Sequence, residues 1–295
     1  MKIKDSELIL NEDGSIYHLH LLPEQVANTI ITVGDPERVE KVSKYFDRIE
    51  HKVHKREFFT HTGYIGSKRI SVISTGIGTD NIDIVLNELD ALVNVDFQKR
   101  VPKENLQKLN IIRIGTSGTM RSDIPVDSFL VSHYGIGMDG LLNYYDRTPN
   151  EQEESLCSLI INCLHEKIAI TGIRPTVAQA SPELVSVFSE NEWYRGITVT
   201  ATGFYAPQNR SIRAKSSVSD IFELFDSISF EGLNVTNLEM ETAGIFGLAN
   251  ILGHQAVSLN AILANRRNGS FSPNPELIVD KLIKKSLEII VNSSL

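Results

Sequence analysis

Basic side chains are neither abundant nor clustered in this sequence. Of 295 residues, 29 are Lys or Arg and 37 are Asp or Glu, which gives a formal net charge of −8. A protein that binds nucleic acid usually presents a dense basic face, and no such run of Lys and Arg occurs here. We therefore expect no nucleic-acid partner. Any anion that is bound should be a small one, held by a local site.

Cysteine is scarce, and long apolar runs are lacking. Cys157 and Cys163, the two cysteines, have no metal-ligand pattern around them. We expect two buried or half-buried thiols in a reducing compartment. The segment 1–14 holds only a short apolar run broken by acidic residues, which predicts neither a signal peptide nor a membrane anchor. The protein is expected to be cytoplasmic.

No internal repeat, low-complexity linker or break in composition divides the chain, so we expect one domain over residues 1–295. β-rich apolar runs alternate with helical patterns. Strands are predicted at 27–34, 68–75, 110–116, 128–135, 197–202 and 255–265. Helices are predicted at 35–46, 80–95, 151–167, 217–228, 237–253 and from 275 onward, and the polar stretch 96–108 as a surface excursion. This alternation predicts an α/β fold with a mixed, mostly parallel sheet covered by helices.

Three predicted strands end in turns that contain glycine, at residues 33–39, 74–81 and 113–119. Ligands of such sheets bind at the carboxyl ends of strands, and glycine lets backbone N–H groups approach an anion. Gly34 precedes a helix start, where the helix dipole favours negative charge. Arg38, Arg113 and Thr116 add donors suited to one phosphate. Neither a Walker loop nor a G-x-G-x-x-G fingerprint occurs, so no nucleoside triphosphate or dinucleotide is implied.

The stretch TNLEME at 236–241 is predicted to start a helix with two carboxylates in its first turn. The helix dipole favours acids there, and for Glu239 this remains an alternative to a role in binding. Met240, between Glu239 and Glu241, suggests a mixed polar and apolar surface for a sugar. A carboxylate can accept hydrogen bonds from two vicinal hydroxyls, as a ribose requires.

The stretch GFYAPQNR at 203–210 places aromatic rings, an amide and a guanidinium within eight residues. On an extended segment, Gln208 and Arg210 would point the same way because side chains alternate. The alternative is a surface loop whose polar side chains face solvent.

Six short motifs follow one another along the chain: VGDPERV, HKREF, STGIG, RIGTSG, FYxxQxR and EMET. In this order they resemble the nucleoside phosphorylase family, and within it the uridine phosphorylase branch, over residues 17–266. The resemblance implies a partly barrel-like mixed sheet wrapped by helices, in a homodimer or hexamer with shared active sites. It also implies reversible phosphorolysis, in which nucleoside and phosphate give free base and ribose 1-phosphate. No cofactor and no metal are implied, since inorganic phosphate is itself a substrate.

The resemblance also implies a set of site residues. The phosphate ligands would be Gly34, Arg38, Arg113 and Thr116, together with Arg56 from a neighbouring subunit. The ribose contacts would be Met240 and Glu241, together with His18 on the 5′-hydroxyl across the same interface. The base pocket would comprise Phe204, Gln208 and Arg210, with Arg266 behind it. Two plainer roles stay open: a core or interface histidine for His18, and a surface ion pair with Glu57 or a nearby acid for Arg56.

The implied base pocket fits the chemistry of uracil. The Gln208 amide offers a donor and an acceptor in one plane, which matches O2 and N3–H, while Arg210 can donate to O4. As the glycosidic bond breaks, negative charge moves onto the ring, where these groups would stabilise it. Gln208, Arg210 and Arg113 are therefore the expected catalytic residues, and no nucleophilic side chain is needed.

Two other functions stay open. A purine nucleoside phosphorylase is one, although purine-specific members carry an aspartate after the late strand, where this chain reads LANR at 263–266. A catalytically silent nucleoside-binding protein is the other, although a pure binder would have no use for the phosphate arginines. Residues 79–81 depart from the family pattern, which leaves an interface metal ion and the assembly open. The preference among uridine, thymidine and deoxyuridine is not determined by these motifs.

Overall fold

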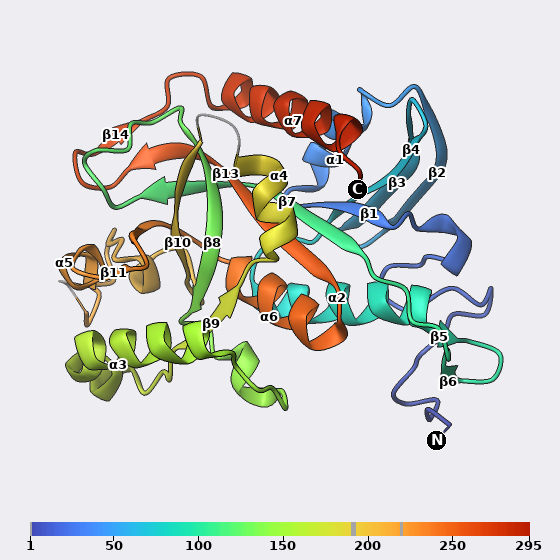
Figure 1. Ribbon diagram of the computed structural model, residues 1–295, viewed down its shortest axis with the longest axis horizontal. Helices are drawn as coiled ribbons and strands as arrows, with labels where there is room; N and C mark the ends of the chain where they lie inside the picture. The colour runs from blue at the N-terminus through green and yellow to red at the C-terminus, as the bar shows by residue number, and fades with distance from the viewer. Residues whose placement is uncertain (1, 190–192, 219–220) are drawn as a thin grey trace.

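The protein is described from a computed structural model covering residues 2–189, 193–218 and 221–295. A single large mixed sheet runs through the molecule, with helices on both of its faces (Figure 1). Its strands are β1 Thr29–Val33, β2 Arg48–Lys55, β3 Phe58–Ile65, β4 Lys68–Ser74, β7 Asn110–Thr119, β8 Phe129–Gly137, β9 Thr176–Gln179, β10 Tyr194–Thr200, β11 Ser229–Phe230, β12 Leu233–Glu239, β13 Gln255–Asn265 and β14 Ser270–Phe271. A separate small hairpin pairs β5 Val95–Asp96 with β6 Val101–Pro102.

The sheet closes on itself at one end. Parallel pairing joins β4, β1, β7 and β13, and also joins β8, β10 and β12. Antiparallel pairing then links β13 to β8 and β12 to β7, so that β7, β13, β8, β10 and β12 form a closed ring. The α/β class and the partly barrel-like mixed sheet are thus confirmed.

Two groups of helices cover this sheet. The helices are α1 Pro36–Ser43, α2 Thr79–Asn94, α3 Glu151–Thr171, α4 Pro182–Ser189, α5 Ile221–Asp226, α6 Thr242–Leu252 and α7 Pro275–Asn292, with 3-10 turns at η1 Pro23–Gln25, η2 Leu141–Tyr144 and η3 Ala206–Gln208. Helices α1, α4 and α7 pack on one side, while α2 and α6 pack together on the other (Figure 1). Helices α3 and α5 contact each other beside β9 and β12.

The core follows from the apolar pattern. Every residue of β1 is buried, as expected of a central strand covered on both faces. Along α2, the predicted stripe of Ile82, Val85, Leu86, Leu89 and Leu92 is completely or almost completely buried. Packing of this stripe holds α2 against the sheet, so that the preceding turn 74–78 lies at the strand ends.

One helix prediction was wrong at its start. Residues 237–239 belong to strand β12, and helix α6 begins only at Thr242. Asn237 and Leu238 pair with β7 and so close the barrel, and this tertiary pairing overrides the local helical pattern. Glu239 therefore ends a strand instead of occupying a first helical turn. The strands β2, β3, β9 and β12 were not predicted.

Other boundaries differ less. The helix predicted at 217–228 is observed as α5, while residues 219–220 of that prediction lie outside the described part of the chain. Both cysteines are free and partly exposed on α3, as predicted. None of the helices among the described residues is long and apolar enough to cross a membrane.

Candidate active site

A cavity of about 670 Å³ opens at the carboxyl ends of the central strands. The predicted site residues that line it are Gly34, Arg38, Arg113, Thr116, Phe204, Gln208, Arg210, Met240 and Glu241. They come from four separate segments of the chain. The structure thus places the predicted phosphate, ribose and base residues of one chain around one space.

The anion end of the cavity lies where β1 runs into α1. Asp35 caps this helix, and its carboxylate accepts a hydrogen bond of 2.9 Å from the backbone N–H of Glu37. The helix N-terminus is therefore not fully open to an anion, unlike the arrangement expected from sequence. Burial lowers the pKa of Arg38, opposed by Asp35, because a guanidinium removed from water favours its neutral form. An incoming anion would relieve this cost.

Arg113 is the centre of charge in the cavity. Its Nη2 lies 2.6 Å from Glu241 Oε2 and 3.0 Å from Glu239 Oε2, and all three side chains are almost fully buried. Burial lowers the pKa of Arg113, but the two carboxylates more than offset this effect, so the pKa is raised. Gly115 provides the space, since a Cβ there would lie 1.8 Å from Arg113 Nη1.

Glu239 organises the end of β12. Its carboxylate accepts hydrogen bonds from the Thr200 hydroxyl at 2.7 Å and from the backbone N–H groups of Glu241 and Thr242 at 2.9 and 3.0 Å. Burial raises the pKa of Glu239, and Arg113 opposes this shift. Glu239 thus holds the backbone that carries Glu241. The reading of Glu239 as an ordinary acid in a first helical turn is wrong.

Glu241 is held from two sides. Its Oε1 accepts a hydrogen bond of 2.9 Å from the backbone N–H of Gly78, and its Oε2 accepts one from Arg113. Gly78 has a φ of 99°, a value that glycine adopts far more readily than other residues. The glycine-bearing turn 74–78 therefore positions the predicted ribose carboxylate.

The segment 203–210 forms the other end of the cavity. It is not extended: it folds into the 3-10 turn η3, followed by Asn209 with a φ of 52°. Even so, Arg210 Nη1 donates to Gln208 Oε1 at 2.5 Å, and its guanidinium stacks 3.8 Å from the centre of the Phe204 ring. Burial lowers the pKa of Arg210 to about 10, which leaves it charged at neutral pH. The amide, the guanidinium and the ring thus form one unit.

Arg266 lies behind this unit and outside the cavity. It donates from Nη1 to the carbonyl oxygen of Gln208 at 3.1 Å and from Nη2 to that of Asn209 at 3.3 Å. It therefore supports the backbone of the turn, while its predicted contact with the base stays a prediction.

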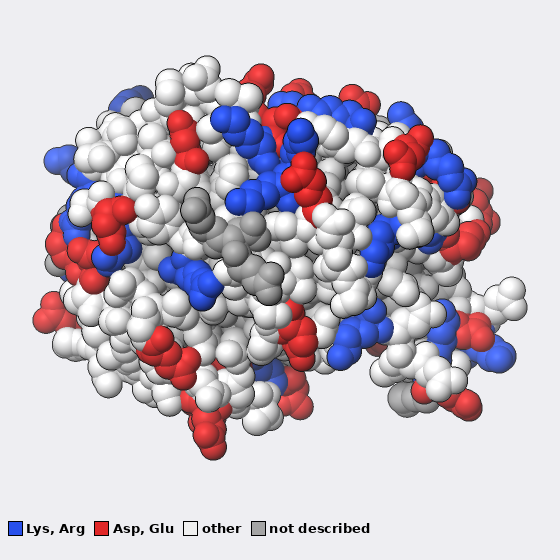
Figure 2. Space-filling model, turned by 45° about the horizontal axis from the view of Figure 1, so that its top comes forward, with Lys and Arg blue, Asp and Glu red and all other residues white. Residues whose placement is uncertain are grey.

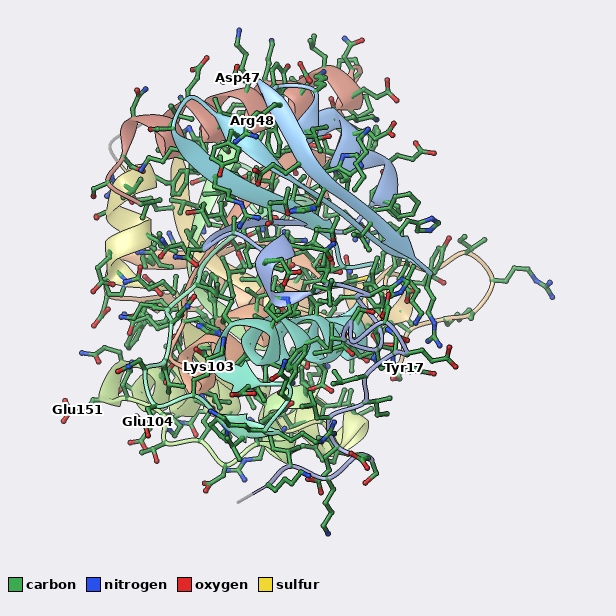
Figure 3. All side chains as sticks on the ribbon, turned by 90° about the vertical axis from the view of Figure 1, so that its right-hand side faces the viewer. Tyr17, Asp47, Arg48, Lys103, Glu104 and Glu151 are labelled. Carbon is green, nitrogen blue, oxygen red and sulfur yellow. The ribbon has the colours of Figure 1, made fainter. Side chains whose placement is uncertain are left out.

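His18 and Arg56 do not line the cavity of their own chain. Glu88 of α2 accepts hydrogen bonds from His18 Nδ1 at 2.6 Å and from the backbone N–H of Leu19 at 2.9 Å. Arg56 occupies the turn between β2 and β3, with its guanidinium 5.8 Å from the centre of the Tyr17 ring. Figure 3 shows Tyr17 at the opposite end of β2 from Asp47 and Arg48. No salt bridge of Arg56 with Glu57 is seen within the described residues.

Sequence reasoning missed several residues of the site. Glu57, Asn81 and Ser117 line the cavity, and each lies within or beside a motif that had been recognised. Asn260 lies behind Arg113, and its only signal is a polar residue inside the apolar run of β13. Within the described residues, no group of three or more His, Cys, Asp or Glu side chains is placed to hold a metal ion.

The cavity therefore has two chemically distinct ends. Arg38 and Arg113 provide positive charge at one end, and a neutral amide with a stacked guanidinium lies at the other. The buried carboxylates of Glu239 and Glu241 also line the cavity, and both contact Arg113. On the molecular face shown in Figure 2, by contrast, acidic and basic side chains are interspersed. The arrangement can bind a small anion together with a flat polar ring.

Comparisons with known proteins agree with this geometry. Residues 28–291 match the family model described as Phosphorylase superfamily. The uridine phosphorylase of Thermococcus kodakarensis is 28% identical over 98% of this chain and 91% of its own length. A purine nucleoside phosphorylase of DeoD type from Vibrio parahaemolyticus is 24% identical over 93% of this chain and 98% of its own.

A solved structure shares the fold closely. A nucleoside phosphorylase of Trypanosoma brucei, reported to show uridine phosphorylase activity, superposes with a TM-score of 0.85 at 28% identity. The match covers 97% of this chain and 100% of the other. The similarity thus extends over the whole sheet and its helices.

Proposed function

The chain belongs to the phosphorylase superfamily, and we propose that it catalyses the reaction of uridine with phosphate to give uracil and ribose 1-phosphate. The observation that carries this proposal is the Gln208–Arg210–Phe204 unit in one cavity with Arg38 and Arg113. It is an enzyme of the pentosyltransferase type. We place the reaction in pyrimidine salvage in the cytoplasm.

Phosphate would bind at the end of the cavity formed by Gly34, Arg38, Arg113 and Thr116. Two guanidinium groups balance its charge, and the backbone N–H of Gly34 and the Thr116 hydroxyl add neutral donors. The site holds the anion beside the ribose, so that the attack becomes effectively intramolecular. No side chain needs to act as nucleophile, because phosphate oxygen itself attacks C1′.

The ribose would lie over Met240 and Glu241. Its vicinal hydroxyls can donate to the Glu241 carboxylate, whose position Gly78 and Arg113 already fix. As the glycosidic bond breaks, positive charge develops on the ribose ring. The buried carboxylates of Glu239 and Glu241 lie where they would stabilise that charge.

The base would be recognised by Gln208 and Arg210. Arg210 already donates to Gln208 Oε1, which leaves Nε2 oriented to donate to O2 while Oε1 accepts N3–H. Arg210 then donates to O4 with its other N–H groups. Because it stays charged and is half-buried, it would stabilise the uracil anion that leaves.

Asn265 disfavours a purine substrate. It lies near the position at which purine-specific members of the family carry an aspartate. Its side chain is fully engaged: Nδ2 donates to the carbonyl oxygens of Arg121 and Ile124, both at 2.9 Å. Its Oδ1 accepts from the backbone N–H groups of Arg267 and Asn268. This amide cannot protonate a purine, so inosine and adenosine should be poor substrates.

A neighbouring subunit would complete the site. His18 and Arg56 do not line the cavity of their own chain, which is consistent with their donation to a partner's ribose and phosphate. We propose a homodimer, or a hexamer of dimers, on this basis.

A substrate panel with and without phosphate tests the proposal. Loss of uridine absorbance should require phosphate, and inosine and adenosine should react little under the same conditions. Turnover of inosine comparable to that of uridine would refute the pyrimidine assignment. Binding of uridine without any cleavage in phosphate would instead identify a silent nucleoside-binding protein. Thymidine and deoxyuridine in the same panel determine the preference at the sugar and at the 5-position of the base.

A further inference from the structure

Asn260 is a polar residue inside a largely buried strand of the barrel, β13. It lies on β13 between Leu259 and Ala261, and none of the three has any exposed surface. A buried amide is unfavourable unless both of its ends are hydrogen-bonded. An apolar side chain would fill the same space without this requirement, so the partners of the amide indicate what it does.

Both ends of the amide have partners. Asn260 Oδ1 accepts a hydrogen bond of 3.1 Å from Arg113 Nη1. Its Nδ2 donates to Ser258 Oγ at 3.2 Å and to Ser132 Oγ at 3.4 Å. Turning the amide over would place its donors against the donors of Arg113. The two serines therefore keep the oxygen directed at the guanidinium.

The chain of polar contacts continues through the barrel. Ser132 Oγ lies 2.6 Å from Thr198 Oγ1, and Thr198 donates to Asn237 Oδ1 at 2.8 Å. Each of these side chains is completely buried. Such a network is rigid because no member can move without leaving another unpaired. Asn260 is thus attached to three other strands of the barrel.

Without this contact, side-chain contacts within the described residues would hold the Arg113 guanidinium through Nη2 alone, and it could rotate about that nitrogen. Its Nη2 is shared by Glu239 and Glu241, and a planar fork tends to pair with carboxylates through two nitrogens at once. Such bidentate pairing would turn further N–H groups away from an incoming anion. A neutral acceptor at Nη1 opposes this rotation without adding a third negative charge beside the phosphate.

We propose that Asn260 is a positioning residue that sets the rotation of the Arg113 guanidinium for phosphate. Asn260 does not line the cavity, so it acts only through Arg113. The inference rests on the proposed function to the extent that Arg113 is a phosphate ligand. It also gives a role to the buried network of Ser132, Thr198 and Asn237, which substrate recognition alone does not explain.

The test is Asn260→Leu, which keeps the approximate size and removes the acceptor. The KM for phosphate should rise about tenfold to a hundredfold, the scale of one hydrogen bond to a charged group. The KM for uridine should change less than about threefold, since the base and sugar contacts remain. The dissociation constant of phosphate without nucleoside, measured from thermal protection, should rise in parallel with its KM.

Asn94→Leu is the matched control, because Asn94 is also buried and hydrogen-bonded but lies at the end of α2. It should leave both KM values unchanged. An unchanged phosphate KM in folded Asn260→Leu, or an equal rise in the uridine KM, overturns the inference. If Asn260→Leu does not fold, Asn260→Ala replaces it, since it removes the same acceptor and introduces no extra bulk. The phosphate KM alone should again rise, and an unchanged phosphate KM would again overturn the inference.

Measurements on the wild-type protein distinguish a failure of this inference from a failure of the proposed function. If it binds phosphate but cleaves no nucleoside, the proposed function fails, while the thermal protection by phosphate still tests Asn260. If it cleaves uridine and Asn260→Leu does so with normal phosphate dependence, only the role of Asn260 fails.

Discussion

Arg113 Nη2 and Glu241 Oε2 lie 2.6 Å apart in the interior of the protein. This contact joins the predicted phosphate ligand of β7 to the predicted ribose ligand before α6. Neither side chain can move without leaving the other partly unpaired in a buried site, which is unfavourable for a charged group. A change that displaces the Arg113 guanidinium from Glu241 should therefore disturb both half-sites.

Gly115→Ala should disable catalysis by displacing Arg113. The new Cβ would lie 1.8 Å from Arg113 Nη1, so the guanidinium must leave its place between Asn260 and Glu241. We expect kcat/KM for uridine to fall at least about 100-fold, the scale of losing one preorganised donor. Gly196→Ala is the control, because its Cβ would lie 2.2 Å from Thr236 Cγ2, and neither residue lines the cavity. Equal losses of activity per folded molecule in both variants would contradict this expectation.

Much of this fold could be predicted from periodicity. The stripe of α2 and the apolar runs of β1 and β13 are local signals that burial then confirms. The start of α6 could not be predicted, because residues 237–239 are drawn into β12 by pairing with β7, which is far away in sequence. The β2–β3 hairpin was missed because its alternating polar residues, with half of β2 exposed, carry no apolar run.

Site residues could be predicted where they lie within a recognised sequence motif. Glycine-bearing strand ends and the FYxxQxR motif led to Arg113, Gln208 and Arg210. The role of Glu239 could not be found in this way, because it depends on hydrogen bonds to Thr200 and to the backbone of Thr242. The role of Asn260 could not be found either, because its contacts form only when the barrel closes around it.

Asp139 provides a prediction on pH. Burial raises the pKa of its carboxyl, and hydrogen bonds from the backbone of Leu141 and the hydroxyl of Thr79 oppose this. A carboxyl with a raised folded-state pKa contributes stability that is complete below its unfolded pKa and is lost as the pH rises through the folded pKa. Asp139→Asn should therefore gain in melting temperature over wild type between about pH 4 and about pH 7. The gain should vanish toward the acid end. A difference that stays constant with pH would show that burial of this charge is not the cause.

The shared active site predicts complementation between inactive variants. Arg56→Ala and Glu241→Ala should each be inactive, the first through the neighbouring subunit and the second through its own. In mixed dimers, one of the two sites would receive both intact residues, so part of the activity should return after subunit exchange. Verified mixed dimers without any recovery would count against donation of Arg56 across an interface. Mixing Arg113→Ala with Glu241→Ala is the control, since both residues line the same cavity and no site would be restored.

Gln208 and Arg210 should divide the recognition of the base between binding and turnover. Gln208 pairs with an edge that uracil presents in both the ground state and the transition state. Gln208→Ala should therefore weaken both the binding of uridine and the stabilisation of the transition state. The loss also leaves the partner groups of the site unpaired, which relaxes discrimination among bases. The ratio of kcat/KM for uridine to that for inosine measures this effect, and it should fall. A ratio that stays constant while both rates drop would assign Gln208 a purely structural role.

Arg210 faces charge that develops only as the glycosidic bond breaks. Arg210→Ala should lower kcat about 10²–10³-fold, the scale of one preorganised donor, with a smaller change in KM. Arg213→Ala is the matched control, because Arg213 lies exposed just after the segment 203–210 and does not line the cavity. The contact between Arg210 and Gln208 Oε1 adds a second expectation: the two single losses should not add in the double variant. If Arg210→Ala raised only KM and left kcat intact, Arg210 would bind the ground state, and stabilisation of the leaving uracil would have to come from elsewhere.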